Sequence, residues 1–337
     1  MKISKKISVM ILILVLIVSF SMAISLTAFA QKPVKLVLAT MLPKEHVYFR
    51  TLEFFADKVK EYYDGPVEFE LHHSGDIGTE KDAFEYMMQG VSVDVSIISP
   101  AWMATWDKRA SFMDAPFLFK NQAAWEEAMD TEVFKPIADV VTEKGVRIIG
   151  YGGGATRNLI LNKPVWKTAD LPSVEMRVQG SPLAKKVFDA VGVKATPMDY
   201  MQVYNAIKTG VLDGLENEPA GMSQMKFYEV APYYVLTDHQ MTVRVLCVSE
   251  KRFQSFPEGL QKAILKAGPE SSKFHHQTEV GEGTKILEDL VEAGKLKVIR
   301  FYNSEIRKRA VPVVEEFAKE VGAYDIFLTC QEINNKH

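Results

Sequence analysis

Apolar and polar positions follow a regular order along the chain after residue 31. Apolar residues recur at helical spacing over 47–62 and over 80–89, and both stretches end at turn-forming residues. Strand-like runs occupy 34–39, 67–71 and 91–98. This β-α-β-α-β order predicts an α/β lobe with parallel strands and with helices on both faces of the sheet.

A second unit of the same kind begins near Arg147. The strands predicted here are 146–149, 158–162 and 175–178, and the predicted helices are 181–191, 202–209 and 257–293. The last helix contains Gly268-Pro269, where we expect a break or a kink. Neither an internal repeat nor a flexible tether is visible, so we expect two α/β lobes that are joined by crossing strands and a long helix.

The first thirty residues have the pattern of a secretory signal peptide. Lys2, Lys5 and Lys6 precede an almost wholly apolar run over 7–20, and Ala28-Phe29-Ala30 is a small-x-small cleavage pattern. We expect cleavage after Ala30 and an exported mature protein. An uncleaved membrane anchor is the alternative, since the apolar stretch approaches spanning length.

Composition and charge narrow the classes of partner. The 337 residues are 47% hydrophobic and 25% charged, which is typical of a globular protein. The formal net charge is −3, and the basic residues of the signal peptide make the remainder more acidic still. This balance argues against nucleic acid and against an anionic membrane surface as partners. The two cysteines, Cys247 and Cys330, could form one disulfide or remain free, and they are too few for a metal cage.

Several motifs point to enzymes or cofactors at first sight but lack the required context. The run from Gly150 to Ala155 fits G-x-G-x-x-[GA], yet a strand pattern closed by Pro164 follows it where a dinucleotide site needs a helix. The adjacent pairs His72-His73 and His275-His276 diverge in direction, and we expect them at the surface. With no nucleophile, metal or cofactor signature, a binding protein is favoured over an enzyme, and we expect no cofactor and no metal.

Arg177 is the residue that most clearly suggests ligand chemistry. It lies between Met176 and Val178 in a predicted strand, and a buried arginine is unfavourable unless it meets an anion. The partner could be an internal acid or a ligand, and the residues alone leave both possibilities open.

The chain also resembles a known family, the solute receptors of tripartite ATP-independent periplasmic (TRAP) transporters of the C4-dicarboxylate-binding type. The motifs that carry the resemblance are 75–80, 90–94, 170–178, 192–198, 202–219, 226–230 and 237–239. The chain departs from the family pattern at 171–175 and at Gln179, where a proline often follows the arginine and valine.

The resemblance implies a set of ligand-binding residues. Arg177 would hold the ligand carboxylate through two parallel hydrogen bonds, and Asn217 would donate to the same carboxylate. Arg157 would be a second arginine in the cleft, and Tyr200 would pack on the ligand. The first lobe would contribute Glu80, His46 and Trp102. Glu80 and His46 would accept hydrogen bonds from ligand hydroxyls.

Four of these residues have a plainer interpretation. Glu80 could be a favourable acid in the first turn of a helix. His46 and Trp102 could be surface or packing residues, and Tyr200 could belong to the core.

The fold and function implied by the resemblance are those of a two-lobed periplasmic binding protein with a ligand cleft between the lobes. We expect lobe I to comprise 31–154 and 243–282, and lobe II to comprise 155–242 and 283–337. A monomer would close on a C4-dicarboxylate or a sugar acid and deliver it to the TRAP membrane permease subunits. The rival classes are a receptor for an ATP-driven importer and an exported enzyme that acts on a small acid.

Overall fold

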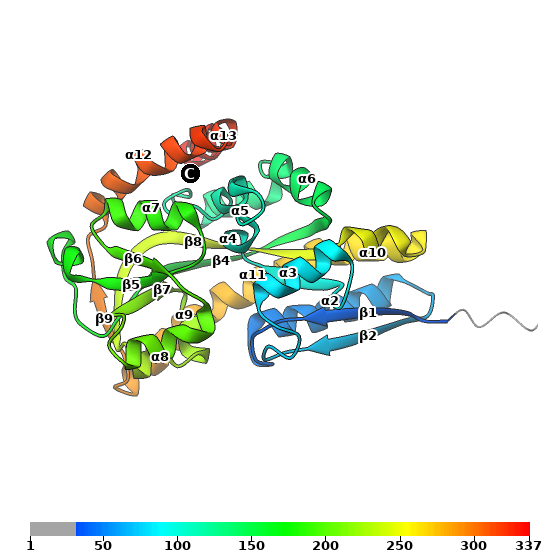
Figure 1. Cartoon of the computed structure of the whole chain (residues 1–337), viewed down its shortest axis with the longest axis horizontal. Coiled ribbons are helices and arrows are strands. Elements are labelled where there is room, and N and C mark those ends of the chain that lie inside the picture. The colour runs from blue at the N-terminus through cyan, green and yellow to red at the C-terminus, as the bar shows by residue number, and fades with distance from the viewer. Residues whose placement is uncertain (1–31) are drawn as a thin grey trace, which may run out of the picture.

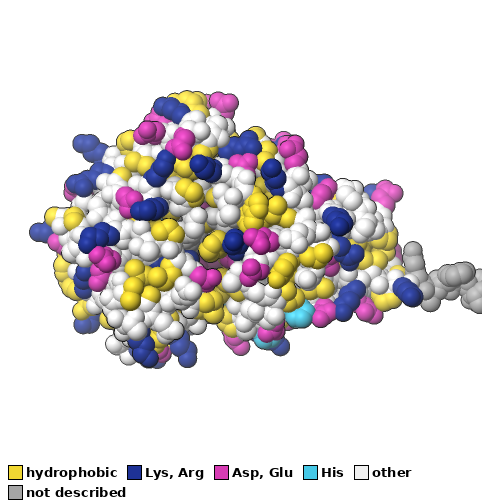
Figure 2. Space-filling model, in the orientation of Figure 1, with side chains coloured by type: hydrophobic (Ala, Val, Ile, Leu, Met, Phe, Trp, Pro, Cys, Tyr) yellow, Lys and Arg dark blue, Asp and Glu magenta, His cyan; other side chains and the backbone are white. Residues whose placement is uncertain are grey.

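The computed structural model describes residues 32–337, so the predicted signal peptide lies outside the described residues. Among the helices of the described part, none combines the length and the apolar character needed to cross a bilayer. Figure 1 shows a sheet that runs through the length of the molecule, with helices packed against its faces. Basic and acidic side chains are interspersed over the face seen in Figure 2.

The strands and helices alternate along most of the chain. The strands are β1 (Val34–Ala39), β2 (Val67–His72), β3 (Val95–Ile98), β4 (Val146–Leu161), β5 (Glu175–Val178), β6 (Lys194–Pro197), β7 (Gly214–Asn217), β8 (Tyr233–Ser249) and β9 (Lys297–Arg300). The helices are α2 (Val47–Tyr62), α3 (Glu80–Gln89), α4 (Pro100–Met103), α5 (Gln122–Asp130), α6 (Lys135–Glu143), α7 (Pro182–Ala190), α8 (Val203–Lys208), α9 (Pro219–Gln224), α10 (Glu250–Ser255), α11 (Glu258–Glu292), α12 (Ser304–Glu320) and α13 (Tyr324–Lys336).

The strands of residues 32–337 form one sheet with the order β2-β1-β3-β8-β4-β7-β5-β6, and β9 pairs with β8. The strands at each end are parallel, as expected for β-α-β units: β1 pairs with β2 and β3, and β5 pairs with β6 and β7. The centre is antiparallel, because β8 pairs with both β3 and β4. The long strands β4 and β8 extend through both halves of the molecule (Figure 1), so they are the connection between the halves.

The glycine run that resembles a dinucleotide motif lies inside β4, where the sequence predicts two separate strands. A Cβ on Gly150 would lie 2.7 Å from the carbonyl oxygen of Gly268 in α11, so the glycine allows the helix to approach the sheet. Gly153 has a φ of +96°, and a Cβ there would lie 2.7 Å from the carbonyl oxygen of Thr242 on β8. The glycines therefore serve close packing and a bulge between Gly153 and Thr156, and no helix begins after them.

Helix α11 bears on two further predictions. It continues from Glu258 to Glu292 with Pro269 inside it, so of the predicted break or kink at Gly268-Pro269 the break does not occur, and the kink stays a prediction. His275 is 1% exposed on the face of α11 that packs on β4, and the prediction of a surface pair is wrong for this residue. His276 stacks on Trp125 with ring centroids 4.6 Å apart. The error arose because the sheet-facing side of α11 carries polar residues, which the local pattern places at the surface.

The C-terminal helices connect the two halves. Lys186 of α7 pairs with Glu320 at the end of α12. Asn334 of α13 accepts from the backbone N–H of Lys120 at 2.8 Å and donates to the carbonyl of Leu118 at 2.9 Å. Helices α12 and α13, drawn in orange and red in Figure 1, therefore contact both α7 and the segment before α5. The predicted lobe boundaries stay a prediction. Cys247 and Cys330 are free and buried.

Candidate functional site

A polar cavity lies between the two halves, beside the centre of the sheet. Seven of its lining residues come from the N-terminal segments: Met41, Leu42, His46, Tyr48, Glu80, Ser99 and Trp102. The others come from the central strands and the second half: Arg157, Arg177, Gln179, Tyr200, Asn217, Glu218 and Arg244. All seven residues that the sequence proposed for ligand binding line this one cavity.

The chain positions these side chains at the ends of regular elements. Arg177 lies on β5 and Asn217 is the last residue of β7, and the two strands are parallel neighbours. Strand ends of this kind are the usual place for ligands in α/β sheets. From the first half, His46 is the N-cap of α2 and Glu80 is the first residue of α3. Trp102 lies in the short helix α4, which follows β3.

Arg177 is buried and largely without protein partners. It is 1% exposed, and its Nε donates to the carbonyl of Met198 at 2.9 Å. Among residues 32–337, no carboxylate lies within ion-pair distance, and the two terminal nitrogens have no hydrogen-bond acceptor. Burial lowers the pKa of Arg177 to about 10, so the guanidinium is charged at neutral pH. A buried, uncompensated cation of this kind favours an incoming anion.

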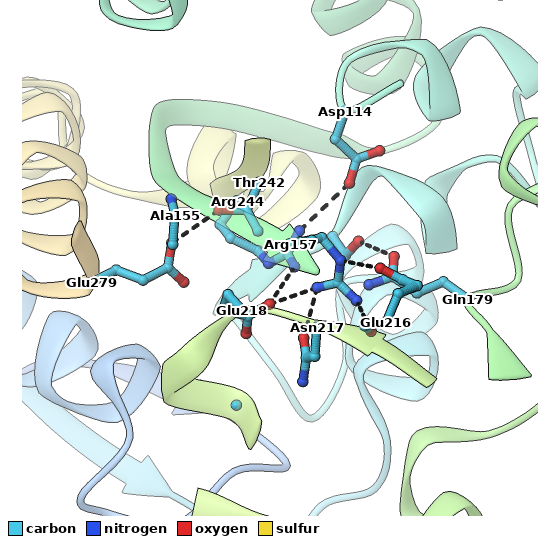
Figure 3. A network of polar contacts seen from close by, with 12 residues as sticks. Asp114, Ala155, Arg157, Gln179, Glu216, Asn217, Glu218, Thr242, Arg244 and Glu279 are labelled. Atoms are coloured by element: carbon cyan, nitrogen blue, oxygen red, sulfur yellow. Dashed lines mark hydrogen bonds and ion pairs between the residues drawn. The ribbon is translucent and has the colours of Figure 1, made fainter. Parts of the chain in front are cut away.

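Arg157 is equally buried, but protein groups engage it (Figure 3). Its Nε pairs with the Glu216 carboxylate, and Nη1 donates to Glu218 at 2.6 Å and to Asn217 Oδ1 at 2.8 Å. Nη2 donates to the backbone carbonyl of Glu216 at 2.7 Å. The predicted second arginine therefore lines the cavity while most of its donors are occupied.

Asn217 and Tyr200 are held in place by this network. Because Asn217 Oδ1 accepts from Arg157, its amide nitrogen faces the other way and donates to Tyr200 Oη at 2.7 Å. The Tyr200 ring centroid lies 5.4 Å from the Arg177 guanidinium, and the ring packs edge-on against Phe227. Tyr200 thus lies between the core and the cavity, with its ring against the arginine that lacks partners.

Glu80 is an unpaired acid in the wall of the first half. It is 8% exposed, its Oε1 accepts from the backbone N–H of Ser99, and no basic side chain of the described chain lies within ion-pair distance. Burial raises the pKa of Glu80 to about 7, although the Ser99 N–H and Arg244 act in the opposite direction. A solvated first-turn acid would not have these properties, and Glu80 can accept hydrogen bonds from a ligand.

His46 differs from the acceptor that the sequence suggested. Its Nδ1 already accepts from the backbone N–H of Tyr48 at 3.1 Å. Burial lowers the pKa of His46 to about 3, so the ring is neutral at physiological pH. The neutral ring therefore carries its proton on Nε2, and this side chain offers a donor to the cavity.

Two contacts join the two halves beside the cavity. Ser99 Oγ donates to Gln179 Oε1 at 3.1 Å. The ring of Trp102 lies over Gly180, where a Cβ would approach it within 3.1 Å. Gln179 is the residue at which the chain departs from the family pattern, and here it forms a contact between the halves.

Sequence reasoning missed Arg244, the third arginine of the cavity. It lies on β8, it is 3% exposed, and its Nη1 donates to the carbonyl of Val243 at 2.9 Å. Asp114 lies 3.5 Å from Nη1 and Glu218 lies 3.9 Å from Nη2. The signal that could have found it is the one that found Arg177, an arginine between two apolar residues, here Val243 and Val245.

Comparison with known proteins agrees with this geometry. The family model of the bacterial extracellular solute-binding proteins, family 7 (DctP), matches residues 38–321. The chain belongs to this family.

A solute-binding protein of Sulfitobacter sp. (strain NAS-14.1) is 40% identical over 302 residues, which cover 89% of this chain and 92% of that protein. The C4-dicarboxylate-binding periplasmic protein DctP of Rhodobacter capsulatus is 23% identical, covering 91% and 93% of the two chains.

Solved structures extend the comparison. A TRAP periplasmic solute-binding protein from Sulfitobacter sp. NAS-14.1 with bound α-D-taluronate has a TM-score of 0.86 at 38% identity, covering 88% of this chain and 97% of that chain. Another, from Chromohalobacter salexigens with bound D-glucuronate, has a TM-score of 0.82 at 27% identity, covering 90% and 100%. These relations confirm the predicted TRAP receptor family and the two-lobed α/β fold. Members of this family are periplasmic, bind small carboxylate ligands and work with membrane subunits.

Proposed function

We propose that this receptor binds a monocarboxylate sugar acid, such as a hexuronate, in the cavity between its lobes and delivers it to TRAP membrane subunits. One observation carries the proposal: Arg177 is buried and charged, and its two terminal nitrogens have no acceptor among residues 32–337. A carboxylate supplies two acceptors in the planar geometry that a guanidinium requires. The bound taluronate and glucuronate of related structures support a sugar acid as the ligand class.

The other cavity residues suit the hydroxyl groups of such a ligand. Asn217 has a second amide hydrogen beyond its bond to Tyr200, and it would donate to the same carboxylate. Glu80 would accept from hydroxyls, and His46 would donate to an oxygen through Nε2. Tyr200 would pack against the ligand beside Arg177, and Trp102 would cover it from the first lobe. Arg157 would act indirectly, by fixing the orientation of Asn217.

Closure of the cleft is the proposed mechanism of loading. The cavity residues come from both lobes, so only a closed state satisfies a ligand on all sides. A ligand shifts an open–closed equilibrium by its differential affinity for the two states. The contacts Ser99–Gln179 and Trp102–Gly180 between the halves would stabilise the closed state. The loaded receptor would then be recognised by the permease, without chemical change of the ligand.

The test is calorimetric titration of the refolded, ligand-free protein with D-glucuronate, D-galacturonate, D-taluronate and succinate. We expect the hexuronates to bind best. Arg177→Lys should weaken every carboxylate ligand by about 2–5 kcal/mol, since lysine cannot form the bidentate pair. Native mass spectrometry of protein purified without refolding should detect a co-purified sugar acid.

The matched control is Arg147→Lys, which alters an ion-paired strand arginine outside the cavity and should leave affinity unchanged. Wild-type affinity in Arg177→Lys would refute the role of Arg177. Preference for succinate would mean that the ligand is a dicarboxylate and not a sugar acid. Turnover of any bound acid would favour the exported enzyme instead.

A further inference from the structure

Arg244 is a buried arginine whose hydrogen-bonding capacity is mostly unused. Of its nitrogens, only Nη1 has hydrogen-bond acceptors, at Val243 and, at 3.5 Å, Asp114. The Nε atom is buried and has no partner among residues 32–337, and the closest acid to Nη2, Glu218, is 3.9 Å away. Nε is closed off by burial, whereas Nη2 is not buried in this way, has no hydrogen-bond acceptor within residues 32–337, and belongs to a residue that lines the ligand cavity.

The surroundings of Arg244 differ from those of Arg177. Arg177 has no carboxylate in ion-pair range within the described chain, whereas Arg244 has both Asp114 and Glu218 (Figure 3). Glu80, in the same cavity, adds a third acid that is partly ionised at neutral pH. Asp114 and Glu218, which Arg244 shares with Arg157, therefore offset the charge of Arg244, while its Nε and Nη2 atoms have no hydrogen-bond acceptor within residues 32–337.

The two arginines also have separate neighbours. Arg177 contacts Met198 and the ring of Tyr200, and Arg244 contacts Val243 and Asp114, so they share no hydrogen-bond partner. One carboxylate held by both terminal nitrogens of Arg177 leaves Arg244 for a different part of the ligand. Oxygen atoms in that part of the ligand would accept from Arg244, a donor with two carboxylates, Asp114 and Glu218, beside it.

We propose that Arg244 is a specificity-determining residue that donates hydrogen bonds to neutral hydroxyl or ring oxygens of the ligand, away from its carboxylate. This inference rests on the proposed function of the same cavity. The acids around Arg244 repel a second carboxylate, so the receptor selects polyhydroxylated monocarboxylates over dicarboxylates of the same carbon skeleton. Specificity of this kind arises because the wrong ligand either leaves donors unpaired or brings like charges together.

The experiment compares three ligands that share one carboxylate. D-Glucuronate has the full set of hydroxyls, glycerate lacks the distal ones, and D-glucarate carries a second carboxylate at the far end. Calorimetry measures D-glucuronate directly, and competition against it measures the weaker two. Arg244→Met should weaken D-glucuronate by at least about 10-fold, the effect of a hydrogen bond to a charged group, and change glycerate by less than about 3-fold. Wild-type protein should bind D-glucarate more weakly than D-glucuronate.

A second variant guards against misfolding. Arg244→Met leaves Asp114 without its partner, so the double variant Arg244→Met/Asp114→Asn removes that carboxylate charge as well. Thermal unfolding of both variants shows whether the fold persists, and the double variant should retain the selective loss for D-glucuronate. Arg147→Met, which removes an ion-paired arginine outside the cavity, should change none of the three affinities.

The outcomes separate the two proposals. Equal losses for D-glucuronate and glycerate would mean that Arg244 only supports the fold, and this inference would fail while carboxylate binding by Arg177 stands. Tighter binding of D-glucarate than of D-glucuronate by the wild type would overturn it as well. If wild-type protein binds none of the three acids, or Arg177→Lys binds them normally, the proposed function fails and this inference fails with it.

Discussion

Arg157 and Arg177 are two arginines of one cavity with the same burial and opposite surroundings. Each is 1% exposed. Arg157 is enclosed by Glu216, Asn217 and Glu218, whereas the terminal nitrogens of Arg177 meet no acceptor within residues 32–337. The comparison teaches that burial alone does not distinguish a structural arginine from a binding arginine. The distinction lies in whether the protein itself supplies the acceptors.

The acids of the two regions follow the same division. Burial would raise the pKa of Glu216, but Arg157 and His239 overcome it and lower that pKa to about 2. Glu80 has no such partner, and burial raises its pKa to about 7. Glu216, which has cationic partners, thus stays ionised. Glu80, which has no ion-pair partner in the described chain, can still accept hydrogen bonds from a ligand.

The largest expected effect is on stability, from Arg157→Met. This variant leaves two buried carboxylates without their cation and should lower the free energy of unfolding by about 3–5 kcal/mol, measured by urea denaturation. The triple variant Arg157→Met/Glu216→Gln/Glu218→Gln removes the stranded charges and should recover part of the loss. An unchanged unfolding free energy in the single variant would contradict the structural role of Arg157.

Arg177→Met should show the reverse behaviour. Removing an unpaired buried charge should lower the free energy of unfolding of ligand-free protein by less than about 1 kcal/mol, because no protein carboxylate loses its partner. Binding of hexuronates should fall by about 2–5 kcal/mol in the same preparation. Denaturation measures the effect on stability and calorimetry the effect on binding. A stability loss as large as that of Arg157→Met would contradict the distinction between a structural and a binding arginine.

Glu80→Gln should change how stability depends on pH. The pKa of Glu80 is about 7 in the folded protein and near its ordinary value of 4.5 when unfolded, so the folded state binds the proton more tightly. Wild-type stability therefore falls as pH rises from about 4.5 to about 7, by at most about 1.4 kcal/mol per pH unit from this group. The variant should lack this contribution.

Denaturation of ligand-free protein at several pH values gives the difference between wild type and Glu80→Gln. Asp114, whose pKa burial raises to about 6, contributes with the same sign in both proteins and cancels in the comparison. Parallel pH profiles would mean that Glu80 is solvated in solution.

Gln179→Ala should give the smallest effect, on closure. It removes the hydrogen bond from Ser99 across the cleft, a net contribution of about 0.5–1.5 kcal/mol to the closed state. We expect weaker ligand affinity and, by solution scattering without ligand, a larger radius of gyration. Ser99→Ala should match it, and the double variant should add nothing further. Additive losses in the double variant would show that the two side chains act independently.

Local structure followed from the sequence wherever neighbouring residues determine it. The predicted helix over 47–62 is α2, and the predicted helix over 80–89 is α3, capped by Thr79 and ended by Gly90 in the left-handed conformation. The strand arginine Arg177 was identified by its apolar neighbours, and it is buried on β5. These features depend on side-chain periodicity and on capping residues within a few positions.

Only the tertiary structure decided which groups satisfy one another. Arg157 meets Glu216 and Glu218 about 60 positions away because β4 and β7 are adjacent strands, a pairing that no local pattern encodes. The glycines of β4 separated two predicted strands that are one strand, because the helix that packs on Gly150 and Gly152, α11, lies more than a hundred residues further along the chain. Arg244 carries the same sequence signal as Arg177, an arginine between apolar residues, but its partners are known only from the fold. An arginine in an apolar strand shows that a partner is needed, but whether that partner is a protein carboxylate or a ligand depends on the groups that folding brings around it.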